Sequence, residues 1–188
     1  MIRQYWPVPG SKLRSEYTAF LVWRDPTEWT PYKTLHGGID LSLGDNQPHQ
    51  VIAAAPGRVV ASSTKTSYSP GLIVTAGITI FQGKPLVLYL VYGHMSPVAV
   101  RENPIGKMVS GGQLLGNYAS RDEIKRLSAE NKTNPGMASH LHFEVRKTLL
   151  GQLGTDKYSS NFDPISFLDG GKLVFGKVSR AAYPVQGW

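Results

Sequence analysis

The sequence contains no cysteine. A disulfide framework and every thiolate metal site are therefore excluded, and a bound metal would need histidine, aspartate or glutamate ligands. No apolar run approaches the roughly 20 residues that cross a bilayer, the most apolar stretch being the short segment 85–91. The first three residues do not begin a charged region that leads into an apolar one. We therefore expect neither a transmembrane segment nor a visible signal peptide in this chain.

Acidic residues are also scarce, with 13 Asp and Glu against 20 Lys and Arg, so the net charge is +7. A basic surface favours anionic partners such as nucleic acid, acidic lipid or an acidic wall polymer. The basic residues are scattered, and no dense Lys/Arg block with interleaved aromatic residues occurs. A nucleic-acid-binding domain is the weakest of the alternatives, and we predict no nucleic-acid partner.

The length of 188 residues, with 20 glycines and 13 prolines, predicts one ordinary domain rich in turns. Residues 120–123 (SRDE) fit a capping box and predict a helix over about 121–130. Residues 161–168 predict a closing turn or short helix. Apolar and β-branched stretches predict strands at 17–23, 50–55, 57–61, 71–81, 85–92 and 173–178.

The stretch HLHFEV at 140–145 carries the strongest chemical signal. Successive side chains of a strand point to opposite faces, so His140 and His142 would share one face and Leu141 and Phe143 the other. Two imidazoles on one face of a strand can serve a metal, or one can ligate while the other handles protons. An isolated pair of this kind is equally consistent with two surface histidines.

Three other histidines complete the set of five, namely His36, His49 and His94. His49 follows a proline in a polar turn, and we interpret it as a surface residue. Asp40 lies four residues after His36, and the two can converge only if the intervening Gly-Gly pair lets the chain bend. Zinc takes histidine and carboxylate ligands and lowers the pKa of bound water to about 7. The residues thus predict a His/Asp metal site suited to hydrolysis, without deciding which side chains ligate.

Three motifs occur in a fixed order, HGGID at 36–40, VYGHMS at 91–96 and HLHFEV at 140–145. This ordered set resembles the lysostaphin-type (LytM-type) zinc metalloendopeptidases, which cut peptides of peptidoglycan. The resemblance extends from about Tyr5 through Leu168. It includes the stretches PVPG, VWRDP, VIAAAPGRVVAS and FDPISFL.

The resemblance implies a mainly β fold, with an antiparallel, β-sandwich-like sheet, one or two short helices and a narrow groove over a Zn²⁺ site. It implies that His36, Asp40 and His142 bind the zinc. It also implies that His94 and His140 are catalytic residues that do not bind it. The substrate would be peptidoglycan peptides, either stem cross-links or interpeptide bridges, with anionic wall polymers as further partners. The protein would act outside the cytoplasm, in the periplasm, in the cell wall or after secretion.

The resemblance also divides the chain. The zinc endopeptidase core would occupy residues 35–169, preceded by an N-terminal segment of the same domain at 1–34 and followed by a C-terminal extension at 170–188. The stretch from Gly116 to Ser139 is longer than the compact loop usual in the family, and we expect it to form one wall of the groove.

Several alternatives stay open at this point. A non-catalytic LytM-like binding module is the main one, although all five motif residues are present. Glu144 shares the face of His142 by alternation and is a candidate to support that ligand, but a solvated or salt-bridged glutamate is the favoured interpretation. Tyr32 lies four residues before His36 at a spacing that does not match the tyrosines of the family, so we leave it out of the site.

Overall fold

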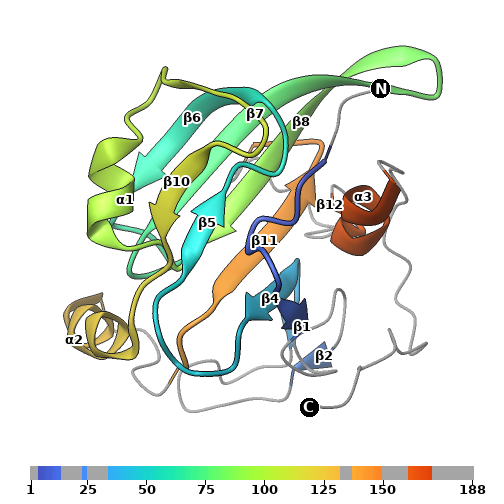
Figure 1. Cartoon of the computed structure of the whole chain (residues 1–188). Coiled ribbons are helices and arrows are strands. Elements are labelled where there is room, and N and C mark those ends of the chain that lie inside the picture. Colours follow the sequence, from blue (N-terminus) through green and yellow to red (C-terminus); the bar gives the residue numbers. More distant parts are fainter. Residues whose placement is uncertain (1–3, 14–22, 25–33, 132–136, 150–160, 171–188) are drawn as a thin grey trace.

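The computed structural model describes residues 4–13, 23–24, 34–131, 137–149 and 161–170. Its centre is an eight-stranded antiparallel sheet with the order β1-β4-β11-β8-β7-β6-β9, and β12 pairs with β11 (Figure 1). The strands are β1 (Lys12–Leu13), β4 (Ile39–Ser42), β6 (Gly57–Ser63), β7 (Leu72–Phe81), β8 (Lys84–Gly93), β9 (Met108–Val109), β11 (Leu141–Arg146) and β12 (Asn161–Phe162).

Two smaller antiparallel pairs accompany the main sheet. One joins β5 (Gln50–Ile52) to β10 (Leu114–Asn117), and the other joins β2 (Trp23–Arg24) to β3 (Thr34–Leu35). The β5–β10 pair shares a hydrophobic core with the main sheet, and the backbone N–H of Ala54 donates to the Tyr92 hydroxyl on β8 at 2.9 Å. The resulting two-layer arrangement agrees with the expected sandwich-like, mainly β fold.

Strand alternation divides the main sheet into two chemically different faces. The core face carries buried apolar side chains, among them Ile39 and Leu41 of β4 and Leu141 and Phe143 of β11, all 0% exposed. The residues between them are polar and lie on the opposite face. On β4 and β11 this second set consists of Asp40, Ser42, His142, Glu144 and Arg146.

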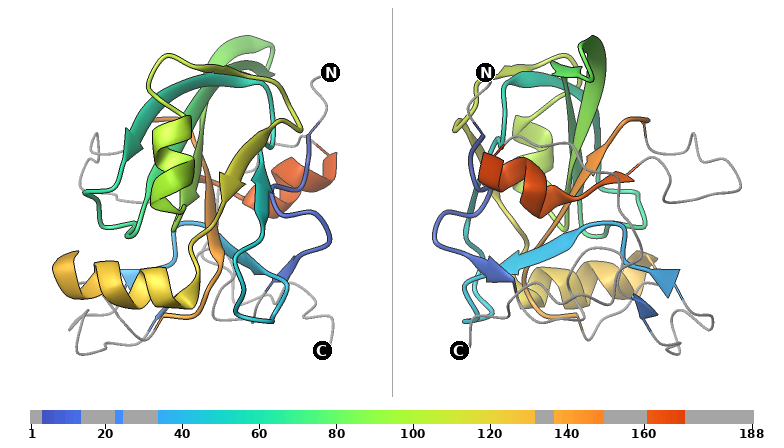
Figure 2. Two further views of the ribbon diagram at one scale, coloured as in Figure 1. Left: turned by 60° about the vertical axis from the view of Figure 1, so that its left-hand side comes forward. Right: turned by 90° about the vertical axis from the view of Figure 1, so that its right-hand side faces the viewer.

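The described residues contain three helices, one more than expected: α1 (Pro97–Glu102), α2 (Arg121–Asn131) and α3 (Pro164–Gly170). The capping box predicted for α2 is present, because Ser120 Oγ accepts from the Glu123 N–H and Glu123 Oε2 accepts from the Ser120 N–H. In both figures α2 lies at the end of the molecule opposite the β7–β8 turn (Figures 1 and 2). None of these helices combines the length and apolarity that crossing a bilayer requires.

The strand predictions for 50–55, 57–61, 71–81 and 85–92 are confirmed as β5, β6, β7 and β8, with ends shifted by one to three residues. The strand that carries the His-x-His motif begins at Leu141, so His140 precedes it rather than belonging to it. The predicted strand 173–178, most of the predicted strand 17–23, and Tyr32 lie outside the described residues.

Candidate metal centre

The candidate site lies on the polar face of the sheet, where β4 and β11 run side by side. His142 is the direct cross-strand partner of Asp40, so the two side chains project from adjacent positions. His36 reaches them because the chain turns across the Gly-Gly pair just before β4. A Cβ atom on Gly38 would lie 2.3 Å from the Phe143 carbonyl oxygen, so only glycine allows this approach to β11.

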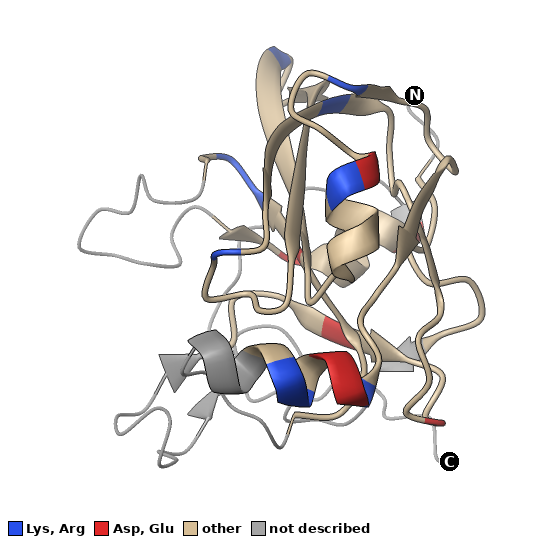
Figure 3. Cartoon of the chain, turned by 90° about the vertical axis from the view of Figure 1, so that its left-hand side faces the viewer, with Lys and Arg blue, Asp and Glu red and all other residues tan. Residues whose placement is uncertain are grey.

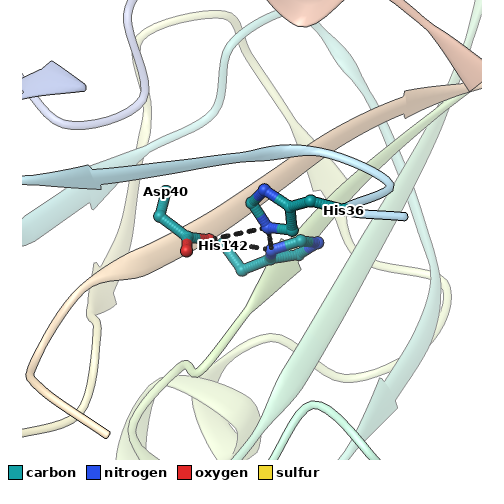
Figure 4. Close-up of side chains that lie close together, drawn as sticks. All are labelled: His36, Asp40 and His142. Atoms are coloured by element: carbon teal, nitrogen blue, oxygen red, sulfur yellow. Dashed lines mark hydrogen bonds and ion pairs between the residues drawn. The ribbon is translucent and has the colours of Figure 1, made fainter. Parts of the chain in front are cut away.

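Three potential ligand atoms converge at this point, His36 Nε2, Asp40 Oδ1 and His142 Nδ1 (Figure 4). The distances are 2.8 Å between the two ring nitrogens, 3.1 Å from His36 to Asp40 and 3.0 Å from His142 to Asp40. A tetrahedral site with bonds of about 2.0–2.1 Å has edges of about 3.3–3.4 Å. The three atoms therefore form a triangle slightly smaller than one face of a zinc tetrahedron, and the donor set fits a Zn²⁺ ion.

Two further histidines flank this triangle. His140 Nε2 lies 3.5 Å from Asp40 Oδ1, and the His94 ring packs edge-on against His140 with centroids 4.7 Å apart. Each ring is oriented by a backbone carbonyl. His94 Nδ1–H donates to Ser69 O at 2.6 Å, and His140 Nδ1–H donates to Ala138 O at 2.7 Å. These bonds place the proton on Nδ1 of both rings and make Nε2 the nitrogen that can accept a proton.

The site is buried, and its electrostatics are strongly coupled. Burial raises the pKa of Asp40, but the charges of His36 and His140 and the bonds to His142 and His36 outweigh it and hold this pKa well below its usual range. Burial, reinforced by His140 and His142, lowers the pKa of His94 well below 6.5. At neutral pH, Asp40 is therefore an anion and His94 a neutral imidazole.

Burial lowers the pKa of His142 as well, but hydrogen bonds to Asp40 and Glu144 overcome this effect and raise it to about 9 without a metal. A metal must therefore displace a proton from this ring when it binds.

The favoured sequence interpretation of Glu144 is a solvated or salt-bridged residue, and the structure shows a buried glutamate with ion pairs to His142 and Arg146. It is only 3% exposed, and its Oε1 lies 2.8 Å from His142 Nε2. Arg146 Nη1 lies 3.5 Å from its other oxygen. The alternation that placed Glu144 on the face of His142 was the available signal for its role. No local pattern in the sequence indicates that Tyr68, 76 residues away, donates to the same carboxylate at 2.7 Å.

The structure thus brings together the five predicted residues, His36, Asp40, His94, His140 and His142. His49 lies apart from them, paired with Asp45 at 2.8 Å in the turn before β5. Three potential ligands for a cation, next to imidazoles that can exchange protons, form an arrangement that could support hydrolysis.

Comparison with solved structures finds related folds. A chain in the crystal structure of a SpoIIIAH–SpoIIQ complex aligns with a TM-score of 0.52 and 23% identity, covering 88% of this chain and 99% of the other. A chain in the structure of the SpoIIQ–SpoIIIAH pore-forming complex gives a TM-score of 0.51 and 23% identity, covering 89% and 92%. At this identity the likeness shows a shared fold. A comparison with curated proteins finds no match.

The sequence profile of peptidase family M23 matches residues 34–161, which is more than half of the chain. The match begins just before the HGGID motif, ends at Asn161 in β12, and includes all five predicted site residues. It confirms the family predicted from the three ordered motifs. The chain belongs to peptidase family M23.

Proposed function

We propose that this protein is a zinc-dependent endopeptidase that hydrolyses peptide bonds of peptidoglycan. The observation that carries the proposal is the convergence of His36, Asp40 and His142 beside His94 and His140, within a chain of the M23 peptidase family. Two imidazole nitrogens and one carboxylate oxygen form a donor set that Zn²⁺ uses in hydrolytic sites, where a fourth position holds water.

His36, Asp40 and His142 would hold the zinc, which when bound supplies Lewis-acid polarisation of a substrate carbonyl and activates water at neutral pH. His94 and His140 would manage the protons of the reaction. Each presents Nε2, with Nδ1 fixed by a carbonyl, so each can accept a proton from the attacking water and, once protonated, stabilise an oxyanion or protonate the leaving amine.

The proposed substrate also agrees with the charge of the protein. A net charge of +7 favours association with anionic wall polymers, and salt should weaken it. Charges of both signs alternate along α2 (Figure 3), where Arg121, Lys125 and Arg126 accompany Asp122 and Glu123. This mixture is unlike the basic stripe of a nucleic-acid-binding protein. An extracytoplasmic location, in the periplasm, cell wall or medium, follows from this substrate.

A second candidate is a non-catalytic module that binds another protein. Its support is that two of the matched structures are complexes of SpoIIQ with SpoIIIAH. Because these likenesses concern the fold, they carry no partner over to this chain. The intact set of five residues favours the enzyme, since a binding module has no need of two oriented proton acceptors beside a metal site.

The test is digestion of purified peptidoglycans of different cross-bridge types, with fragments identified by mass spectrometry. We expect new peptide ends from the zinc-loaded protein, none after treatment with a zinc chelator, and a loss of rate of about 10²–10⁴-fold in His140→Ala and His94→Ala. His49→Ala, which removes a histidine outside the site, is the matched control and should retain activity. If zinc-loaded protein releases no peptide from any substrate, the enzyme assignment is wrong and the binding module takes its place.

A further inference from the structure

Glu144 is a buried acid for which the proposed reaction has no direct use. It follows His142 by two residues on β11, so the two side chains project from the same face of the sheet. Its Oε1 accepts a hydrogen bond from His142 Nε2–H at 2.8 Å, on the side of the ring away from Asp40. The acid thus occupies one nitrogen of the imidazole while the other faces the candidate metal.

The position of Glu144 is fixed by side chains from two other parts of the chain. The Tyr68 hydroxyl, in the loop between β6 and β7, donates to Oε1 at 2.7 Å. The Asn161 side-chain amide, at the start of β12, donates to Oε2 at 3.2 Å and to the Gly37 carbonyl at 2.6 Å. Asn161 therefore connects the acid to the HGGID segment that carries two of the proposed ligands.

Tyr68 also contacts the ligand itself. Its ring lies 5.4 Å from the His142 ring, centroid to centroid, and packs over Gly93 on the neighbouring strand. A Cβ atom on Gly93 would lie 2.7 Å from Tyr68 Cδ1, so the glycine provides the space for this ring. The tyrosine is thus held against His142 by packing and against Glu144 by a hydrogen bond.

We propose that Glu144, held in place by Tyr68 and Asn161, is a positioning residue that orients His142 for metal binding. This inference rests on the proposed metal site. A neutral imidazole carries its proton on one of two nitrogens, and the nitrogen without it is the metal ligand. A carboxylate that accepts from Nε2–H selects the form whose Nδ1 is available, fixes the ring plane and makes Nδ1 a stronger donor.

A purely structural role for Glu144 is the competing explanation, because Arg146 is buried beside it and needs a counter-charge. The distances favour the positioning role, since His142 is 2.8 Å from the carboxylate and the nearest contact from Arg146 is 3.5 Å. The two explanations predict different measurements. A counter-charge to Arg146 would affect stability alone, whereas a positioning residue would affect the affinity for metal.

The experiment measures the zinc dissociation constant by competition with a chromophoric chelator, together with the melting temperature of the metal-free protein. Glu144→Gln keeps the size of the side chain and an acceptor oxygen but removes the charge. We expect it to weaken zinc binding about 10- to 100-fold. Tyr68→Phe removes a single hydroxyl and should weaken zinc binding in the same direction, by less. Glu102→Gln, the same change at an exposed position at the end of α1, is the control and should bind zinc as the wild type does.

Long-range ¹H–¹⁵N NMR of the zinc-loaded protein shows which ring nitrogen of His142 carries the proton. This measurement does not depend on the stability of the fold. In the wild type, the proton of His142 should reside on Nε2.

Unchanged zinc affinity in both Glu144→Gln and Tyr68→Phe, with a lower melting temperature of the metal-free protein, would overturn the proposal in favour of a counter-charge to Arg146. If Glu144→Gln does not fold, Tyr68→Phe decides alone. A wild-type protein that binds no zinc overturns both the metal assignment and this inference. A protein that binds zinc as described but cuts no peptidoglycan contradicts the proposed enzyme and leaves the role of Glu144 supported.

Discussion

His94 has an unusual backbone conformation, with φ at +61° at the end of β8. For a residue with a Cβ atom, this left-handed conformation costs roughly 1–2 kcal/mol relative to the right-handed one. Three hydrogen bonds hold His94 there, from its N–H to Tyr68 O, from its Nδ1–H to Ser69 O, and from the Ala119 N–H to its carbonyl. The geometry turns the chain out of β8 and brings the ring against His140.

A pair of substitutions at this position should reveal the backbone strain. Both His94→Ala and His94→Gly remove the imidazole, so the loss of its contacts is common to the two proteins. We expect the glycine variant to be more stable by about 1–2 kcal/mol, because glycine adopts positive φ without steric cost. Chemical denaturation of the two variants measures the difference, and equal stability would mean that this residue is unstrained.

Tyr92 should make the stability of the fold depend on pH in the alkaline range. Burial raises its pKa to about 12, from about 10 in the unfolded chain. A group whose pKa is higher in the folded state stabilises that state. This stabilisation is fully present at pH values below the pKa in the unfolded chain, and it is lost as the pH rises through the pKa in the folded state. The free energy of unfolding should therefore fall by about 2.7 kcal/mol as the pH rises from 10 to 12, the two pKa values of Tyr92.

Tyr92→Phe should remove this dependence. The variant leaves the Ala54 N–H without its acceptor, which lowers stability by an amount that does not vary with pH. Denaturant unfolding of both proteins between pH 8 and 11.5 should show their difference shrinking above pH 10. A difference that stays constant across this range contradicts the expectation.

At the scale of elements, the approach of the HGGID segment to β11 depends on the absence of a side chain at Gly38. An added Cβ would meet the Phe143 carbonyl at 2.3 Å and Glu144 Cγ at 2.7 Å. We expect Gly38→Ala to push the β4 segment away from β11 and to weaken zinc binding at least tenfold, since Asp40 lies only two residues further on.

Zinc titration of purified Gly38→Ala checks this expectation. Gly111→Ala is the comparison, because the nearest atom to its added Cβ is in the Tyr5 ring at 3.0 Å, and a side chain can give way where a backbone carbonyl cannot. Equal zinc affinity in the two variants would show that the segment has room to move.

The elements differ in how well the sequence predicts them. α2 was predictable because its capping box is a local signal, satisfied within four residues. α1 was missed although Ser96 caps it and Pro97 opens it, since six residues are too few to show a helical period. The five site residues were identified through the ordered motifs. Tyr68 and Asn161 were not, because their roles depend on cross-sheet proximity that no spacing in the sequence encodes.

The metal should influence the stability of the whole molecule, because its proposed ligands come from β11 and from the segment at β4, which lie about a hundred residues apart in sequence. A ligand that binds only the folded state stabilises it by about 2.7 kcal/mol at 100 times its dissociation constant. For a chain of this size, that corresponds to a rise in melting temperature of about 5–10 °C. Removal of zinc by a chelator should lower the melting temperature by this amount, and zinc should restore it.

Differential scanning fluorimetry of the wild type and His36→Ala checks this prediction. The variant lacks one of the three proposed ligands, so its melting temperature should hardly respond to zinc. An equal response in both proteins would place the stabilising ion elsewhere.

The proposed ligands His36 and His142 are 106 residues apart in sequence. During synthesis His36 and Asp40 emerge first, and β11 with His142 and His140 emerges about a hundred residues later. A chain that ends before residue 140 has neither the third proposed ligand nor one of the two proposed proton acceptors. Under the proposed function, a growing chain acquires catalytic competence only after residues 140–142 have emerged, and products truncated before them would not cut peptidoglycan.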